Sequence, residues 1–208
     1  MIDFYTWGTP NGRKVAVMLE ETGVKYQVFP INIGKDEQFA PDFLAISPNN
    51  RIPAIVDHEP PAAYGAKPYS IFESGAILIY LAEKTGQFLP KDAAARMQAI
   101  QWLMWQMGGF GPMLGQAHHF LRAAKEQVPY GIERYTTEAK RLYRVLNGHL
   151  GKNEYLAGKE YSIADIATQP WAARHEWHQV DLADYPHVKR WFDIIAARPA
   201  VQRGFEIP

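Results

Sequence analysis

Cysteine is absent from this chain of 208 residues. Its absence excludes a protein thiol nucleophile, a redox-active CxxC pair, a thiolate metal site and a disulfide framework. Any sulfur chemistry that the protein performs must therefore use the sulfur of a ligand.

An excess of charge of either sign is also missing. The 22 basic and 22 acidic residues are interspersed and give a formal net charge of +0. Neutralising the phosphates of a nucleic acid would require a basic stripe, which the sequence lacks. The 47% hydrophobic and 13% aromatic content instead indicates a packed globular protein with one large or two modest domains.

Long hydrophobic runs are missing as well. No apolar segment reaches the roughly 18 residues that would predict a membrane span. The first residues, MIDFYTWGTP, include Asp3 and have no basic region followed by an apolar stretch, so they do not resemble a secretory signal. We therefore expect a cytoplasmic protein that binds neither membrane nor nucleic acid.

The N-terminal part reads as short alternating elements. Strands are predicted from β-branched and aromatic runs, and helices from apolar residues at helical spacing with Gly closing their ends. The order is strand, helix, strand, then a hairpin and a second helix, which predicts a mixed sheet covered by helices. The predicted strands are 2–6, 26–33, 52–57 and 69–73, and the predicted helices are 9–23 and 74–86.

The pattern changes near residue 88, where we place a domain boundary. From Ala93 onward no convincing strand is present, and Ser162 with Asp165 has capping-box spacing before an apolar run. Pro170 is expected to kink or shorten the helix that follows. The expected division is 1–87 for an α/β domain, 88–92 for a linker and 93–208 for an all-helical domain. Helices are predicted at 93–107, 129–150, 162–178 and 186–197.

Polar residues gather at the start of the first predicted helix. Thr9, Asn11 and Gly12 offer a hydroxyl, an amide and close backbone access where a helix concentrates N–H groups and partial positive charge. A ligand thiolate would be stabilised there. The alternative is that Thr9 simply caps the helix.

Two later segments carry similar signals. In SPNNRIPAIVD the base rate for X-Pro bonds favours a trans Ile52-Pro53 bond, whereas a cis bond would present the N–H and C=O of Ile52 to an extended peptide. In FESGAILIYL, Ser74 at the helix start could receive an α-carboxylate while Glu73 meets an ammonium group. The alternative is that Ser74 only caps that helix.

Other candidate residues favour packing over chemistry. The side chains of the adjacent pair His118-His119 would point about 100° apart on a helix, so they make a poor metal pair. They are expected to line the outer part of the active-site cleft. The segment HEWH at 175–178 lacks HExxH spacing, and the Trp and Met residues of 102–107 are expected in the core and the cleft wall. We predict no metal site.

Taken together, these motifs resemble the glutathione transferase family over nearly the whole chain. The nearest similarity is to the nu class, the bacterial disulfide-bond oxidoreductases. The TPN and GGFGPMLGQ stretches are specific to that subgroup, whereas ESGAI and SIAD mark the superfamily. Further segments that carry the resemblance are TPNGRKV, SPNNRIPAIVD, FESGAILIYLAEKTG and QWLMWQMGGFGPMLGQAHHF.

The resemblance implies a thioredoxin-like N-terminal domain that binds glutathione, in its reduced or disulfide form, as a co-substrate. It also implies an all-helical second domain and a homodimer. The implied roles are Thr9 and Asn11 facing the sulfur as catalytic residues, Ile52 before a cis-Pro53 pairing with the cysteinyl residue, Glu73 and Ser74 holding the γ-glutamyl end, Gln38 reaching the glycyl side, and Arg134 contributing from the neighbouring subunit.

One position departs from the better-known patterns of the superfamily. A tyrosine, serine or cysteine usually lies near the sulfur, but here Tyr5 lies inside a predicted strand and Thr9 takes the candidate position. A threonine hydroxyl is no base near neutral pH, yet it can donate a hydrogen bond to a thiolate and so lower the pKa of the ligand thiol. We predict reduction of small disulfides by bound glutathione; the alternatives are conjugation of glutathione to electrophiles and a non-catalytic glutathione-binding regulator.

Overall fold

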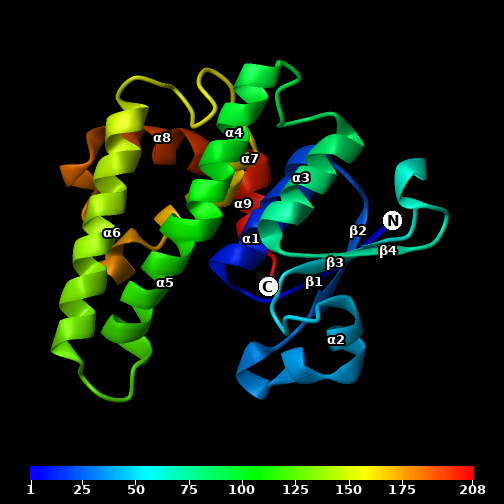
Figure 1. Cartoon of the computed structure of the whole chain (residues 1–208), viewed down its shortest axis with the longest axis horizontal. Coiled ribbons are helices and arrows are strands. Elements are labelled where there is room, and N and C mark those ends of the chain that lie inside the picture. The colour runs from blue at the N-terminus through cyan, green and yellow to red at the C-terminus, as the bar shows by residue number, and fades with distance from the viewer. The chain divides into compact units, whose positions relative to one another are not determined.

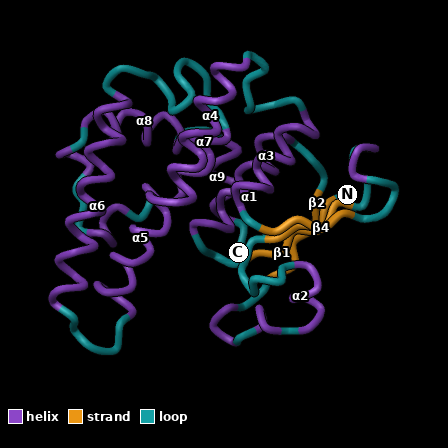
Figure 2. Tube along the Cα trace, viewed as in Figure 1, coloured by secondary structure: helices purple, strands orange, loops and turns teal.

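The computed structural model describes residues 1–208, which form two compact units. The first comprises Met1–Leu89 together with Arg198–Pro208, and the second comprises Pro90–Ala197. Every strand of the sheet lies in the first unit, as Figure 2 shows in orange. None of the helices combines the length and the apolar character that a membrane crossing needs.

The first unit is built on one four-stranded sheet with the order β2-β1-β3-β4. β1 pairs parallel with β2 and antiparallel with β3, which pairs antiparallel with β4. The mixed sheet predicted from the sequence is therefore confirmed. Its elements are β1 (Ile2–Thr6), α1 (Pro10–Thr22), β2 (Tyr26–Pro30), α2 (Pro41–Ile46), β3 (Ala54–Asp57), β4 (Tyr69–Phe72), α3 (Ser74–Thr85) and α9 (Pro199–Glu206).

The second predicted strand is shorter than expected. β2 ends at Pro30, and the N–H of Ile31 then donates to the carbonyl oxygen of Thr6 at 2.8 Å. Asn32 caps a short 3₁₀ turn by accepting the N–H of Gly34 at 3.0 Å. Local side-chain capping thus ends the strand before residue 33.

Helices cover both faces of the sheet in this unit. α1 and α3 pack against each other, and α2 lies on the opposite face (Figure 1). The α1 face that packs inward carries Val15, Met18 and Leu19, all buried, and the helix ends at Gly23 in the left-handed conformation with φ 67°. This arrangement agrees with a period of 3.6 residues for the apolar positions.

The C-terminal helix α9 packs on α1, so residues 198–208 belong to the first unit. A Cβ on Gly204 would lie 2.8 Å from the Cα of Val17, and Arg198 donates to Glu21 at 2.6 Å. The expected range of 93–208 for the helical domain is therefore too long at its end. Residues 199–206 form a helix that the sequence pattern did not indicate.

The second unit is all-helical. The π-helical turn Gln106–Phe110 joins α4 to α5, and a second π-helical turn, His119–Ala123, follows α5. The predicted helix 93–107 stopped before this continuation. Pro112 lies in the first turn of α5, directly after the π-helical turn. The helices are α4 (Ala93–Trp105), α5 (Gly111–His118), α6 (Pro129–Leu150), α7 (Ile163–Ala172) and α8 (Pro186–Ala196).

The start and end of α7 confirm two sequence predictions. Ser162 and Asp165 form the expected capping box, in which Asp165 accepts the N–H of Ser162 at 2.9 Å. The helix ends at Ala172, shortly after Pro170, so the predicted stretch 162–178 is shortened as that proline suggested. A 3₁₀ turn, His175–His178, follows separately.

Candidate functional site

Strand register brings the predicted site segments of the first unit to one edge of the sheet. Ala54 at the start of β3 pairs with Tyr5 near the end of β1 and with Phe72 at the end of β4. The chain therefore leaves β1, enters β3 and leaves β4 at the same edge. The segments at these three points are the TPN loop, the Ile52-Pro53 bond and the Glu73-Ser74 pair.

Thr9 is the cap of α1. Its extended backbone, with φ −113° and ψ 160°, lets Oγ1 accept the N–H of Gly12 at 3.2 Å. A hydroxyl has two acceptor lone pairs and one proton, so this bond does not use the Thr9 proton. Capping and donation to a ligand sulfur are therefore compatible roles of one side chain.

The start of α1 offers fewer main-chain donors than a bare helix end would. Pro10 has no N–H, Gly12 donates to the Thr9 side chain, and Arg13 donates to the Thr9 carbonyl oxygen at 3.0 Å. The expected row of outward amides is thus mostly used within the turn. The Thr9 hydroxyl proton and the dipole of the helix remain for a ligand, and the half-buried Asn11 lies at the same helix end.

Ile52 and Pro53 are joined by a cis peptide bond. The base-rate expectation of a trans bond is therefore wrong, and the cis bond implied by the family resemblance is present. Ser47 steadies the preceding loop by donating from Oγ to the carbonyl oxygen of Arg51 at 2.8 Å. Because the ladder of β3 begins at Ala54, the N–H and C=O of Ile52 lie beyond it.

The start of α3 differs from its predicted capping. Glu73, with φ 72° and ψ 113°, occupies the cap position, and its side chain makes no cap hydrogen bond. Ser74 is the first residue inside the helix and is only 4% exposed. Because Glu73 holds the cap position, the alternative that Ser74 serves only as a cap is wrong. This helix end retains its positive pole for an anionic group.

Lys14 is a residue of this region that the sequence analysis did not identify. It is 1% exposed, and its Nζ donates to Ser74 Oγ at 3.4 Å, which links α1 to the start of α3. Burial lowers the pKa of Lys14 to about 7, while the neighbouring Glu73 acts in the opposite direction. One sequence signal was available: Lys14 lies one helical turn before the buried Met18, on the apolar face of α1.

Gln38 lies in a 3₁₀ turn, Glu37–Phe39, after β2. Its Nε2 donates to Asp36 Oδ1 at 3.4 Å, whereas its Oε1 is buried and has no hydrogen-bond partner. A buried acceptor without a partner costs free energy. A ligand N–H group at this position would satisfy it.

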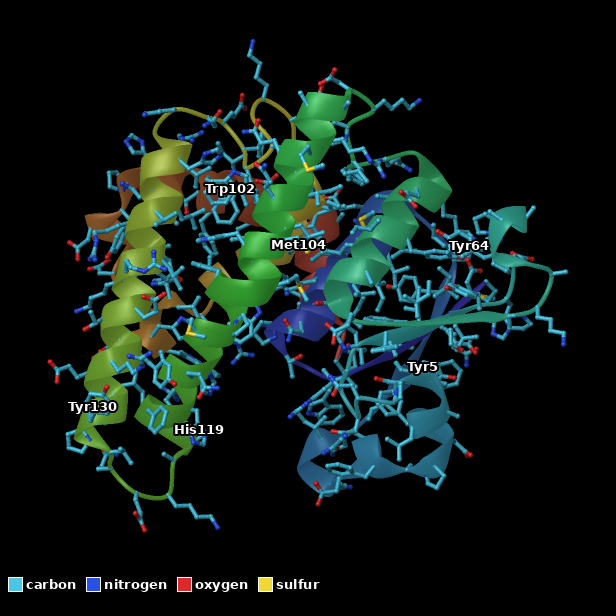
Figure 3. All side chains as sticks on the ribbon, in the orientation of Figure 1. Tyr5, Tyr64, Trp102, Met104, His119 and Tyr130 are labelled. Atoms are coloured by element: carbon cyan, nitrogen blue, oxygen red, sulfur yellow. The ribbon has the colours of Figure 1, made fainter.

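Tyr5 packs on the face of the sheet covered by α2. Its ring stacks on Phe29 at a centroid distance of 5.0 Å and contacts Phe43 of α2 at 6.2 Å, and Figure 3 shows it on that side. Burial, followed by the charge of Asp3, raises the pKa of its hydroxyl. A tyrosinate is therefore disfavoured, and the ring contacts with Phe29 and Phe43 agree with the position predicted for Tyr5 inside a strand.

Arg134 belongs to the second unit. It is exposed on α6, with its guanidinium 5.9 Å from the ring of Tyr135. It lines a cavity of about 560 Å³ together with Met113, Tyr130, Glu133, Tyr135, Thr137 and Glu138. Figure 3 shows Tyr130 near the start of α6, where it is 73% exposed.

The remaining candidates of the second unit behave mostly as packing residues. The His118 ring contacts the Trp177 ring at 4.8 Å, and His178 is fully buried. The ring of Trp102 contacts that of Trp105 at 5.0 Å, and both residues are half-buried, so neither belongs fully to the core. Met104, labelled on α4 in Figure 3, is 47% exposed and therefore does not belong to the core; its expected place in the cleft wall stays a prediction.

These features define a class of protein. A thioredoxin-like domain places a cis-proline and the N-terminal ends of two helices at one edge of its sheet, and an all-helical unit follows in the sequence. The buried acceptor of Gln38 and the uncapped start of α3 fit a polar, anionic ligand. With no cysteine in the chain, a thiol at this site must come from that ligand.

Comparison with known proteins identifies the family. The sequence matches the glutathione S-transferase N-terminal domain over residues 2–83 and the glutathione S-transferase C-terminal domain over residues 115–199. It is 54% identical, over 96% of this chain and 92% of the relative, to the disulfide-bond oxidoreductase YfcG of Escherichia coli. The chain belongs to the glutathione S-transferase family.

Solved structures show the same architecture. A glutathione transferase family member from Pseudomonas fluorescens, with two glutathione bound, superposes with a TM-score of 0.93 at 48% identity, covering 100% of this chain and 93% of that one. A glutathione transferase from Pseudomonas putida, with one glutathione disulfide bound per subunit, gives a TM-score of 0.94 at 44% identity, covering 100% and 91%.

Proposed function

We propose that this protein is a nu-class glutathione transferase that reduces small disulfides with glutathione as the thiol substrate. The observation that carries the proposal is the Thr9 cap of α1 in a chain without cysteine: its hydroxyl accepts the N–H of Gly12 and keeps its own proton for a ligand sulfur. The 54% identity to an E. coli disulfide-bond oxidoreductase supports this reaction class.

The reaction is thiol–disulfide exchange. A glutathione thiolate attacks one sulfur of the substrate disulfide, forms a mixed disulfide and releases the first substrate thiolate. A second glutathione thiolate attacks the glutathione sulfur of that mixed disulfide, which gives glutathione disulfide and the second substrate thiolate. Two electrons pass from two glutathiones to the substrate, and the two thiol protons pass to the two products.

The protein's contribution is to hold thiolates and align sulfurs. Thr9 donates a hydrogen bond to the sulfur anion, and Asn11 with the α1 dipole adds to its stabilisation, so a larger fraction of the thiol is ionised near pH 7. Holding the reacting sulfurs in one site also lowers the entropic cost of exchange. The two glutathione molecules bound to the P. fluorescens relative support a site that accommodates both thiols.

The other predicted residues would hold the tripeptide along the sheet edge. Ile52 would pair its backbone with the cysteinyl residue, next to the cis-Pro53. Glu73 would meet the ammonium and Ser74 the α-carboxylate of the γ-glutamyl end. Gln38 would receive a donor of the glycyl side through its buried Oε1.

A homodimer completes the proposal, with Arg134 reaching the site of the neighbouring subunit. The exposure of Arg134 on α6 is compatible with such a contact. Its permanently charged guanidinium is suited to a ligand carboxylate. The cytoplasmic location expected from the sequence stays a prediction.

Paired rate measurements test the proposed reaction. With glutathione as the thiol, the wild-type protein should turn over a simple dialkyl disulfide faster than it conjugates a chlorinated nitroaromatic. The opposite order would favour the conjugating transferase. Tight glutathione binding with neither reaction would favour the non-catalytic regulator.

A further inference from the structure

Helix α9 meets the charged side chains of α1 in two different ways. Near the end of α1, Glu21 accepts a hydrogen bond from Arg198 at 2.6 Å in a salt bridge. Near its start, the guanidinium of Arg13 lies over the ring of Phe205, 4.8 Å from the ring centroid. One charge of α1 is therefore matched by a charge of opposite sign, whereas the other is matched only by an aromatic ring.

The guanidinium of Arg13 has an unused hydrogen-bond donor. Its Nε is buried and has no partner. Burial lowers the pKa of Arg13, and no neighbouring carboxylate acts in the opposite direction. A partly desolvated cation without an anion costs free energy, which an anionic ligand would recover. Because Phe205 contacts the flat face of the guanidinium, the N–H groups at its edge stay available for such a ligand.

The position of Arg13 relates this charge to the proposed sulfur site. Arg13 lies one helical turn after Thr9, on the same face of α1, and its backbone N–H donates to the Thr9 carbonyl oxygen at 3.0 Å. Long side chains on a helix lean toward the N-terminal end, which is the direction of Thr9. Four residues of helix rise only about 6 Å. A molecule bound beside Thr9 can therefore reach the guanidinium through a short chain.

Helix α9 brings Phe205 to this position because it runs antiparallel along α1 (Figure 1). Gly204 lies against Val17, where an added Cβ would stand 2.8 Å from the Val17 Cα. The next residue, Phe205, meets Arg13 one turn nearer the start of α1. The close approach at Gly204 thus fixes the ring that holds the guanidinium.

We propose that Arg13, held by Phe205, binds a carboxylate of the substrate disulfide, so that the protein prefers anionic disulfides. Exchange requires the substrate sulfur to lie in line with the glutathione sulfur beside Thr9. A carboxylate on a short alkyl chain from that sulfur then lies within reach of Arg13. No acidic residue is present in the first turn of α1, so the helix dipole adds to the attraction. This inference rests on the proposed function, because the disulfide is the proposed substrate.

A series of small disulfides that differ in charge tests the inference. Dithiodipropionate is anionic, hydroxyethyl disulfide is neutral and cystamine is cationic. Each kcat/KM at saturating glutathione is divided by the uncatalysed rate constant of the same disulfide with glutathione, which removes differences in intrinsic reactivity. The wild-type protein should give the highest normalised value with the anion and the lowest with the cation, with the difference expressed mainly in KM.

Substitutions of Arg13 assign this preference to its side chain. Arg13→Gln should lower the ratio of the anionic to the neutral kcat/KM on the order of tenfold, because a charge-assisted pair is lost. Arg13→Lys keeps the charge without the planar fork and should restore part of the ratio. An effect of the charge on the glutathione thiol changes both rate constants alike and cancels in the ratio.

Two further variants test the part played by α9. Phe205→Leu removes the aromatic face and should lower the same ratio about two- to fivefold. Arg203→Gln is the matched control, because Arg203 is exposed on α9 and pairs with Glu20 at 2.5 Å. Its ratio should equal that of the wild type. Far-ultraviolet circular dichroism checks folding; if Arg13→Gln does not fold, Arg13→Lys and Phe205→Leu carry the test.

The outcomes separate this inference from the proposed function. If Arg13→Gln changes the rate constants for all three disulfides by the same factor, Arg13 does not bind the substrate carboxylate and the inference is overturned. Equal normalised values for the anionic and the neutral disulfide in the wild type would overturn it as well, while leaving disulfide reduction in place. If the wild type reduces none of the disulfides, the proposed function fails, and this inference fails with it.

Discussion

The backbone of Gly12 lies directly against Trp7, so that a Cβ added to Gly12 would stand 2.5 Å from the Trp7 carbonyl oxygen. The same Cβ would meet the buried hydroxyl of Thr6. Neither atom can give way easily, because one is backbone and the other is 1% exposed. A side chain at residue 12 is therefore incompatible with the observed turn between β1 and α1.

Gly12→Ala should lower the free energy of unfolding by about 1–3 kcal/mol, as overpacking does elsewhere. It should also displace Thr9, whose Oγ1 accepts the Gly12 N–H, and so reduce disulfide turnover. Urea unfolding and steady-state rates measure the two effects. The matched control is Gly8→Ala, because a Cβ on Gly8 would meet nothing within 4 Å. Equal stability of the two variants would contradict the prediction.

Thr9→Ala should separate capping from thiol activation. Loss of the cap should cost about 1 kcal/mol of unfolding free energy, and loss of the hydroxyl donor should raise the pKa of the bound glutathione thiol. The absorbance of the thiolate as a function of pH measures that pKa, alongside the rate of disulfide turnover. Thr9→Ser keeps both functions and should behave as wild type. If Thr9→Ala changes stability alone, the residue is only a cap.

The sequence predicted the sheet and the site segments because both depend on local signals. Capping residues, a glycine at the end of α1 (Gly23) and strand-like apolar runs mark the elements of the first unit without reference to the rest of the chain. Ser162 with Asp165 predicted the start of α7 for the same reason. The cis state of Ile52-Pro53 came only from resemblance, since local statistics favour trans.

Features that depend on distant contacts were missed. The predicted helix 93–107 stopped before the GGFGPMLGQ stretch, where Gly111 and Gly115 permit Trp171 to approach: a Cβ on either would come within 3.3 Å of its ring. Helix α9 is short, and its place against α1 depends on Gly204. Lys14 received no role because its partner Ser74 lies 60 residues further along the chain.

Asp165 is predicted to be a principal stabilising residue of the second unit. Its buried carboxylate accepts hydrogen bonds from Leu156 N at 2.9 Å, from Ser162 N at 2.9 Å and Oγ at 3.0 Å, and from Trp191 Nε1 at 2.8 Å. Asp165→Asn puts an NH₂ group among these donors and should lower the free energy of unfolding by roughly 3 kcal/mol.

Chemical denaturation followed by tryptophan fluorescence measures the effect of Asp165→Asn. Asp193→Asn is the matched control, because Asp193 is 56% exposed and pairs only with Lys189 at 2.6 Å on the surface of α8. That control should change the stability by less than about 0.5 kcal/mol. A similar loss in both variants would show that the buried carboxylate has no special role.

Subunit mixing should test whether Arg134 acts across a dimer. Arg134→Ala should raise the glutathione concentration needed for half-maximal rate without affecting stability, because the side chain is exposed. Unfolding and refolding Thr9→Ala together with Arg134→Ala should restore activity. In the mixed dimer, one site combines an intact Thr9 with an intact Arg134 from the other subunit. Activity no higher than the mean of the separate variants would place Arg134 outside the neighbouring site.

The charge of Lys14 should cost stability in a pH-dependent way. Burial lowers its folded-state pKa to about 7, below the value near 10.4 expected in the unfolded chain, so the unfolded state binds the proton more tightly between these limits. The free energy of unfolding of the wild-type protein therefore decreases as the pH falls from about 10 to 7, and the contribution of Lys14 to it is constant below that.

Lys14→Met removes the titrating group. Urea denaturation measures the free energy of unfolding of both proteins. The value for Lys14→Met minus the value for wild type should be larger at about pH 6.5 than at about pH 9.5. The same difference at both pH values would mean that Lys14 carries no depressed pKa in the folded protein, and that the buried cation is not maintained at the expense of stability.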